Sequence, residues 1–130
     1  KAANLKYIHG DFFQGDHRSG LSGLSSEDKF DCIHLGWILH DWQDDKALEI
    51  LTRVRNHLSV DGILVLTEII MDESRVDLKA GLSDLVMLLQ TGGKERTLSE
   101  YSALLQKSSF SLKQVLKSDS VRSMIVAVPV

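Results

Sequence analysis

The 130-residue chain is long enough for one domain with a hydrophobic core, and its 43% apolar and 25% charged residues are ordinary for a globular protein. Its net charge is −3, and its Lys and Arg residues form no basic stripe, which argues against nucleic-acid binding. No apolar run is long enough to span a membrane, and no signal peptide is visible. The single cysteine, Cys32, cannot form an internal disulfide, so we expect a buried thiol in a cytoplasmic protein.

The first predicted elements are two strands separated by a surface loop. Residues 5–9 alternate apolar and polar side chains, which is the pattern of a strand. Residues 14–28 are rich in Gly, Ser and charge and indicate a loop, and residues 30–35 form a short apolar run that predicts a buried strand. Because the chain does not begin with Met and enters a strand almost at once, we expect it to be a piece of a longer protein.

An amphipathic helix follows, and its inward face is expected to hold Ala47, Leu48, Leu51, Val54 and Leu58. Asp41 or Asp44 can cap the start of this helix, and residues 60–62 should end it. The continuous apolar run at 63–67 is typical of a parallel strand that is buried on both faces. This strand is expected to end at Glu68.

Two more helices and a strand pair complete the prediction. One helix spans about residues 78–90, with one face formed by Leu82, Leu85, Val86 and Leu89. A capping box at 97–100 starts the next helix, whose inward residues are expected to be Leu98, Tyr101, Leu104 and Leu105. Strands at 111–117 and 124–130, joined through 118–120, form an antiparallel hairpin. The alternation of strands and helices predicts an α/β fold with a mostly parallel sheet.

Polar residues follow three of the predicted strands, namely Asp11, His40 and Glu68. Ligands bind beyond the carboxyl ends of parallel strands, so these side chains are expected to converge. A neutral histidine can accept a proton from a hydroxyl, with Glu68 as its partner. The alternatives stay open: Asp41 can be only a helix cap, Glu68 an exposed strand end, and His40 a buried histidine without a catalytic role. No metal site is predicted, because His34 and His40 lack ligand spacing.

Four elements in combination resemble a known family: "GDFF" at 10–13, "LHDW" at 39–42, the strand that ends at Glu68, and "GGKERT" at 92–97. From Leu5 to the C-terminus the chain resembles the S-adenosylmethionine-dependent O-methyltransferases, in particular the acetylserotonin and caffeic acid O-methyltransferase group. The resemblance implies a Rossmann-like sheet in the order 3-2-1-4-5-7-6. Residues 1–130 would be the C-terminal portion of one catalytic domain, without its first strands, its glycine-rich cofactor segment and a dimerisation domain. We therefore expect the 130-residue chain alone to have no methyltransferase activity.

The resemblance also implies a function, the transfer of a methyl group from S-adenosyl-L-methionine to a hydroxyl of a small aromatic acceptor. The full-length protein would be a cytoplasmic homodimer. His40 matches the general base, and Glu68 and Glu95 match two acidic residues that orient its ring and favour its charged form. The cofactor contacts would be Gly10, Asp11, Phe12, Gly36 and Trp37. The acceptor contacts would be Asp41, Val86 and Gln90.

Some positions depart from the family pattern. Family members often carry a basic residue where this chain has Gly36 and Trp37, and the acetylserotonin enzymes carry an acceptor-contacting asparagine where it has Val86. The tryptophans are interpreted differently: Trp42 as packing, and Trp37 as either packing or a cofactor contact. One alternative function is a non-catalytic relative that keeps the methyltransferase-like fold for binding or dimerisation. A nicotinamide-dependent Rossmann enzyme is another, but the chain lacks its fingerprint.

Overall fold

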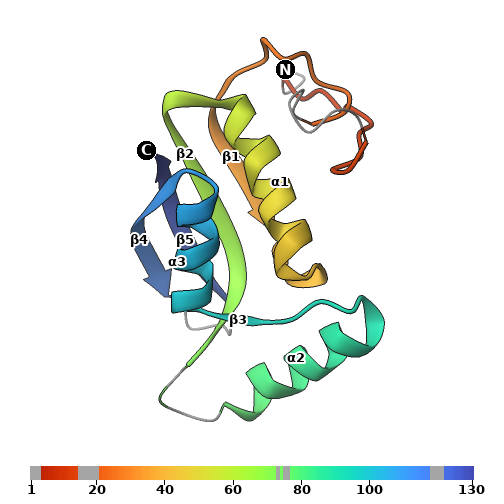
Figure 1. The fold of residues 1–130 in the computed structure, drawn as a ribbon, viewed down its shortest axis with the longest axis vertical. Coiled ribbons are helices and arrows are strands. Elements are labelled where there is room, and N and C mark those ends of the chain that lie inside the picture. The colour runs from red at the N-terminus through yellow and green to blue at the C-terminus, as the bar shows by residue number, and fades with distance from the viewer. Residues whose placement is uncertain (1–3, 15–20, 73, 75–76, 118–121) are drawn as a thin grey trace.

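The computed structural model describes residues 4–14, 21–72, 74, 77–117 and 122–130. Its elements are, in order, β1 (Phe30–Gly36), the 3-10 helix η1 (Leu39–Asp41), α1 (Asp44–His57), β2 (Leu58–Met71), α2 (Leu78–Gln90), β3 (Arg96–Thr97), α3 (Leu98–Lys107), β4 (Phe110–Lys117) and β5 (Arg122–Pro129). The strands form one sheet in the order β1-β2-β5-β4, and the short β3 pairs with the end of β2 (Figure 1). The predicted α/β class is therefore confirmed.

The main sheet is parallel on one side and antiparallel on the other. β1 and β2 run parallel, because α1 crosses between them and returns the chain in the same direction. β5 runs antiparallel to both β2 and β4. The predicted C-terminal hairpin is confirmed, and its turn at 118–120 lies outside the described residues. The expectation of a mostly parallel sheet is wrong, because β5 doubles back along β4 and inserts beside β2.

One face of the sheet carries the hydrophobic core. Alternate residues of β2, including Leu64 and Leu66, are fully buried in a cluster with side chains from both α1 and α3. Burying one such leucine contributes about 2 kcal/mol. Val65 on the opposite face is only half-buried, so the predicted burial of this strand on both faces is wrong. The reason is that α1 and α3 both pack on the face that Leu64 and Leu66 occupy.

The ends of α1 differ from the prediction. Gln43 is the N-cap residue, and it makes no side-chain capping bond, so neither Asp41 nor Asp44 caps the helix. At the other end the helix stops at His57, and β2 begins at Leu58 without a loop. Leu58 is buried as predicted, but as a strand residue.

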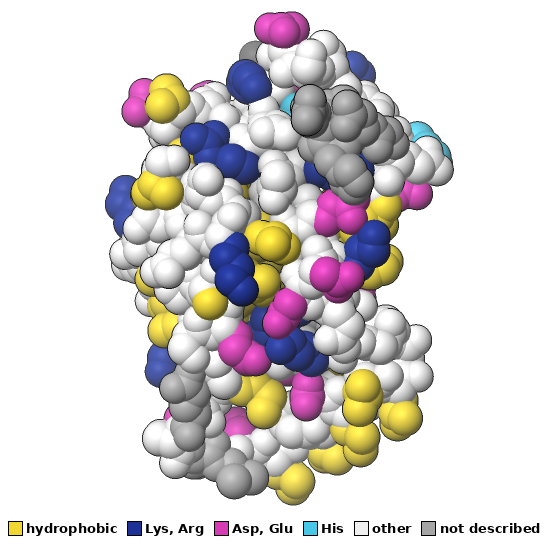
Figure 2. Space-filling view, in the orientation of Figure 1, with side chains coloured by type: hydrophobic (Ala, Val, Ile, Leu, Met, Phe, Trp, Pro, Cys, Tyr) yellow, Lys and Arg dark blue, Asp and Glu magenta, His cyan; other side chains and the backbone are white. Residues whose placement is uncertain are grey.

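α2 has the predicted bounds and a different environment. Asp77 caps it by accepting hydrogen bonds from the backbone N–H groups of Lys79 and Ala80. Its apolar face is exposed, with Leu82, Leu85, Val86 and Leu89 between 42% and 76% accessible. In Figure 1 α2 lies apart from the sheet, and Figure 2 shows hydrophobic side chains gathered over it at the lower right. Helical periodicity identified the face but could not say what covers it.

The capping box of α3 is confirmed in both halves: Thr97 Oγ1 accepts from Glu100 N, and Thr97 N donates to Glu100 Oε2. Tyr101, Leu104 and Leu105 are buried as predicted. Leu98 is 37% exposed, so its predicted inward position is wrong. It is the first residue of the helix, where the chain has only just left β3.

The N-terminal segment is irregular. Residues 5–9 form no strand, contrary to the prediction, because this segment packs across the 21–24 loop rather than along β1. Cys32 is exposed on β1, so its predicted burial is also wrong. Among the described residues β1 pairs only with β2, which leaves its other edge uncovered. None of the helices in the described part of the chain is long and apolar enough to cross a membrane.

Candidate active site

His40 lies in a short turn between β1 and α1. This turn, η1, is held by backbone bonds from Asp41 N to Ile38 O and from Trp42 N to Leu39 O. Leu39 is fully buried in the core, and His40 is 3% exposed. The turn therefore places an imidazole just beyond the carboxyl end of β1, where the polar strand ends were predicted to meet.

Glu68 reaches this turn from β2. Leu64, Leu66 and Glu68 occupy alternate positions, so the period of the strand directs the carboxylate to the buried face. Its Oε1 accepts hydrogen bonds from Ile38 N at 3.2 Å and from Leu39 N at 2.9 Å. Its Oε2 is buried and has no hydrogen-bond partner within the described ranges. β2 continues to Met71 beyond the predicted end at Glu68, because β3 pairs with its last residues.

Glu95 reaches the imidazole from the other side. The Nδ1 of His40 lies 3.1 Å from Glu95 Oε1, which also accepts a bond from Ser83 Oγ at 2.7 Å. The backbone N–H of Glu95 donates to Asp84 Oδ1, so one residue of α2 binds the carboxylate of Glu95 and another binds its backbone. Because an ionised carboxylate only accepts, Nδ1 carries the proton and Nε2 is left to accept one.

Gly93 allows the segment that carries Glu95 to lie close to His40. A Cβ on Gly93 would lie 2.0 Å from the carbonyl oxygen of His40, which is closer than any side chain tolerates. The next residue, Lys94, donates its backbone N–H to the same oxygen at 2.9 Å. Gly93 thus does more than end α2: it brings the segment before β3 against η1, and Glu95 against His40.

The pKa values of His40 and Glu68 both rise. The hydrogen bond to Glu95 raises the pKa of His40 above its ordinary 6.5, the charges of Glu68, Glu95 and Asp41 add to this, and burial opposes it. Burial raises the pKa of Glu68 from 4.5 to about 7, although the Leu39 N–H lowers it. The pKa of Glu68 therefore lies close to neutral pH and that of His40 lies above its ordinary value, and such groups suit general acid–base chemistry.

Arg96 is a buried residue of this site that the sequence analysis missed. Its guanidinium donates to Leu39 O at 2.8 Å and to Trp42 O at 2.7 Å, the carbonyls on either side of His40 and Asp41. It also donates twice to Asp44 Oδ1. The sequence signal for Arg96 was its place next to Glu95 in "GGKERT", because neighbouring side chains of an extended segment point to opposite sides of the chain.

The structure brings two further predicted residues against His40. Asp41 Oδ1 lies 3.6 Å from His40 Nε2, on a side chain that is 36% exposed. The Trp37 ring meets the imidazole edge-on, with centroids 5.2 Å apart, and Arg122 Cζ lies over the Trp37 ring, 4.3 Å from its centroid. Trp37 has a φ of 58°, and its N–H donates to Thr67 O as β1 ends. Gly36, the last residue of β1, is half-buried.

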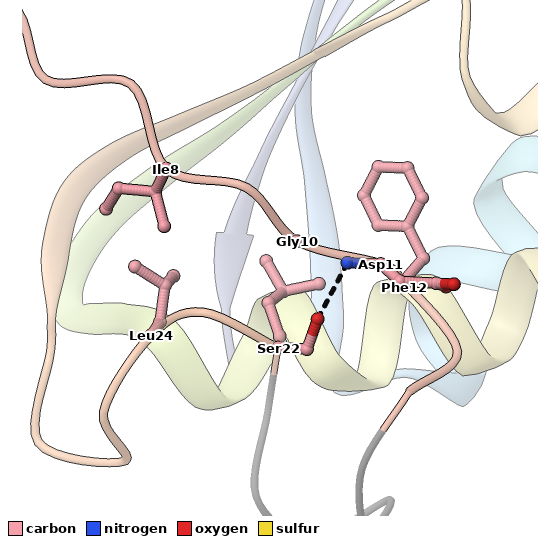
Figure 3. A pocket seen from close by; sticks show the side chains of 7 residues that line it. Ile8, Gly10, Asp11, Phe12, Ser22 and Leu24 are labelled. Carbon is pink, nitrogen blue, oxygen red and sulfur yellow. Dashed lines mark hydrogen bonds between the residues drawn. The ribbon is translucent and has the colours of Figure 1, made fainter.

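Gly10, Asp11 and Phe12 line a separate pocket of about 270 Å³ (Figure 3). Ile8 and three residues of the facing loop complete the lining, Leu21, Ser22 and Leu24. Asp11 N donates to Ser22 Oγ across the pocket at 2.7 Å. Phe13 packs edge-on against Trp42 at 4.7 Å, which joins "GDFF" to "LHDW" and agrees with the prediction that Trp42 is packing.

The remaining predicted acceptor contacts lie on α2. Val86 is 42% exposed, and Gln90 is exposed at the last turn of the helix. α2 is tied to the site through Ser83 and Asp84. The three catalytic candidates offer one nitrogen and two carboxylate oxygens within 4.8 Å of one another, a spacing that could also hold a metal ion. Their bonds to each other and to backbone N–H groups suit a proton-transfer site equally well.

Comparison with known proteins identifies the family. The O-methyltransferase domain matches residues 1–111. The chain is 32% identical to O-methyltransferase 12 of Dictyostelium discoideum, over 95% of this chain and 30% of the relative. It is 32% identical to isoflavone 4'-O-methyltransferase of Medicago truncatula, over 97% of this chain and 34% of the relative. The crystal structure of human N-acetylserotonin methyltransferase in complex with SAM superposes with a TM-score of 0.73 at 31% identity, over 89% of this chain and 32% of that one.

The chain therefore belongs to the O-methyltransferase domain family, and the predicted resemblance is confirmed. It spans about a third of the length of these relatives.

Proposed function

We propose that the protein is an S-adenosylmethionine-dependent O-methyltransferase and that this chain is the C-terminal portion of its catalytic domain. One observation carries the proposal: a buried imidazole is bound at Nδ1 by one buried carboxylate and lies beside a second. Membership of the O-methyltransferase family supplies the reaction class. Cytoplasmic location and a full-length homodimer remain predictions of the resemblance.

His40 is the proposed general base. Glu95 holds Nδ1, so Nε2 takes the proton of the acceptor hydroxyl. The positive charge that forms on the ring is stabilised by Glu95 and Glu68, the same charges that raise the pKa of His40. Glu68 has a second task, because its bonds to the N–H groups of Ile38 and Leu39 hold the backbone that carries the base.

The pocket lined by Gly10, Asp11 and Phe12 fits the adenine end of the cofactor. An aromatic ring, apolar side chains and a carboxylate surround it, which suits a flat base with an amino group. Gly36 and Trp37 would contact the cofactor on the side toward His40. Bound S-adenosylmethionine would supply the methyl group that the deprotonated acceptor oxygen receives.

The acceptor is proposed to be a small aromatic molecule with a hydroxyl group. Asp41, beside Nε2, would face this molecule, and Val86 and Gln90 would contact it from α2. Among the relatives, isoflavone 4'-O-methyltransferase is named after an acceptor of this kind. The apolar side chain of Val86 favours an apolar part of the acceptor over an amide.

The test is His40→Gln in the full-length protein, assayed with S-adenosylmethionine and a panel of hydroxylated aromatic compounds. We expect kcat to fall on the order of 10²–10⁴-fold while cofactor affinity is retained, because the glutamine keeps the shape and loses the base. His34→Gln is the matched control, since His34 is exposed on the face of β1 opposite the buried Leu35 and bonds to Thr67 Oγ1. Unchanged turnover by His40→Gln would refute the assignment of the base.

A non-catalytic relative that uses the same fold for binding or dimerisation is the second candidate. The buried carboxylates argue against it, because burying Glu68 and Glu95 costs free energy that a scaffold could avoid. Wild-type protein that binds S-adenosylhomocysteine but methylates no compound of the panel would favour this candidate.

A further inference from the structure

The pocket at Gly10–Phe12 is built from two irregular segments, 8–12 and 21–24, that lie side by side (Figure 3). Their backbones are unusually close: a Cβ on Gly10 would lie 2.4 Å from Ser22 O, and one on Gly23 2.4 Å from His9 O. Neither segment belongs to a helix or strand, so no regular hydrogen-bond ladder keeps the pocket in shape. Something else must hold the 21–28 loop in place.

His57 provides this support from the far end of α1. Its side chain is fully buried, and its Nε2 accepts the backbone N–H of Leu21 at 2.8 Å. Its Nδ1 lies 2.9 Å from the carbonyl oxygen of Asp28. One imidazole therefore joins both ends of the 21–28 loop to the core helix.

The two partners specify the form of the ring. A backbone carbonyl can only accept, so Nδ1 donates to Asp28 O. A backbone N–H can only donate, so Nε2 must be unprotonated. The two bonds therefore specify one tautomer of the ring, with its proton on Nδ1.

We propose that His57 is a positioning residue for cofactor binding. It sets the place of Leu21, and through the turn from Leu21 O to Leu24 N it sets the wall of the pocket formed by Ser22 and Leu24. It contacts no reacting group and acts only through the loop. The proposal rests on the proposed function, in which this pocket holds the adenine end of S-adenosylmethionine.

Three substitutions separate the two bonds. His57→Leu removes both, His57→Gln keeps an acceptor for Leu21 N near the place of Nε2, and His57→Asn keeps a donor for Asp28 O near the place of Nδ1. Thr52→Ala is the matched control, because Thr52 is exposed on the same helix and bonds only locally to Leu48 O. The readouts, in the full-length protein, are the Kd for S-adenosylhomocysteine by calorimetry and KM for S-adenosylmethionine against kcat.

We expect His57→Leu and His57→Asn to raise the Kd and KM about tenfold, the size of one lost bond to a buried backbone group, with kcat at saturating cofactor within about twofold. His57→Gln should bind close to wild type. If His57→Leu does not fold, His57→Asn decides the matter. Wild-type-like cofactor binding by His57→Asn would overturn the proposal, and so would a loss confined to kcat.

Failure of the proposed function gives a different result. If the wild-type protein itself binds no S-adenosylhomocysteine, both proposals fall together. If the wild type binds and all three His57 variants bind equally well, only the role of His57 is refuted. If His57 only stabilised the fold, His57→Gln would also have a lower melting temperature, and its cofactor affinity would not return to the wild-type value.

Discussion

Arg96 and Asp44 form a two-bond ion pair that closes the turn carrying His40. The Nε and Nη2 of Arg96 both donate to Asp44 Oδ1, at 3.0 and 2.9 Å. The same guanidinium binds the carbonyl oxygens of Leu39 and Trp42. Arg96 is fully buried, so every donor that these four bonds use is withdrawn from water.

Replacing Arg96 should therefore destabilise the protein. We expect Arg96→Met to lower the free energy of unfolding on the order of 3 kcal/mol, because the buried carbonyl of Leu39 and the half-buried carbonyl of Trp42 lose their donor. Arg96→Lys should cost less, since an ammonium keeps the charge but cannot make all the bonds of the fork. Asp44→Asn should cost under about 1 kcal/mol, because the Asp44 side chain is 57% exposed. Urea unfolding of the full-length protein measures all three, and equal stability of Arg96→Met and wild type would refute the role given to Arg96.

Glu68 should make stability depend on pH. Its folded pKa of about 7 lies above the ordinary 4.5, so the folded state binds the proton more tightly than the unfolded state does. This contribution is fully present below pH 4.5 and is lost as pH rises to about 7, a change of up to about 3 kcal/mol. Glu68→Gln keeps the acceptor for Leu39 N and removes the titration. We expect it to be more stable than wild type at pH 8 and equally stable near pH 4.5, and parallel stability curves for the two would contradict this.

The acid limb of the rate profile should report His40. Its pKa is raised, chiefly by the hydrogen bond to Glu95, so kcat/KM of wild type should rise with pH through a midpoint above 6.5. Glu95→Gln removes that cause, and we expect its midpoint to move to lower pH and its maximal rate to fall. Asp45→Asn is the control, because Asp45 is exposed in the first turn of α1. A midpoint that stays in place in Glu95→Gln would show that another group governs this limb.

Substitutions on the apolar face of α2 should hardly change the free energy of unfolding of the 130-residue chain. Leu89 is 76% exposed, and Leu51 is fully buried in the core. We expect Leu89→Ala to change the free energy of unfolding by less than about 0.5 kcal/mol and Leu51→Ala to lower it by about 2–5 kcal/mol. Exposed leucines should also bind the dye ANS, and Leu89→Lys should reduce that binding. A large cost of Leu89→Ala would mean that this face of α2 is packed.

Local signals were reliable where the causes are local. The capping box at Thr97 and the bounds of α2 follow from hydrogen bonds between residues that are neighbours along the chain. Of the three residues that were predicted to converge, His40 and Glu68 meet, because a strand–helix–strand unit brings two carboxyl ends to one edge of the sheet, whereas Asp11 lines a separate pocket. The role of Glu95 came from the family resemblance alone.

The incorrect predictions concern long-range packing. Residues 5–9 alternate like a strand, but their segment packs across the 21–24 loop. The continuous apolar run at 63–67 predicted a strand buried on both faces, but helices cover only one face of β2. Arg96 and His57 look like ordinary polar helix or loop residues in the sequence, and only the fold gives them buried partners.

Residue order alone predicted the α/β class, the family and the three residues of the proposed proton-transfer site, because periodicity, caps and motifs are local features of a sequence. Only the fold brings these residues together and buries them. Burial raises the pKa of Glu68, the hydrogen bond to Glu95 raises that of His40, Arg96 binds the turn that carries His40, and His57 supports the proposed cofactor pocket. These contacts join residues up to 57 positions apart in the sequence. The energy of each interaction depends on distances of a few ångströms, which no local pattern in the sequence encodes.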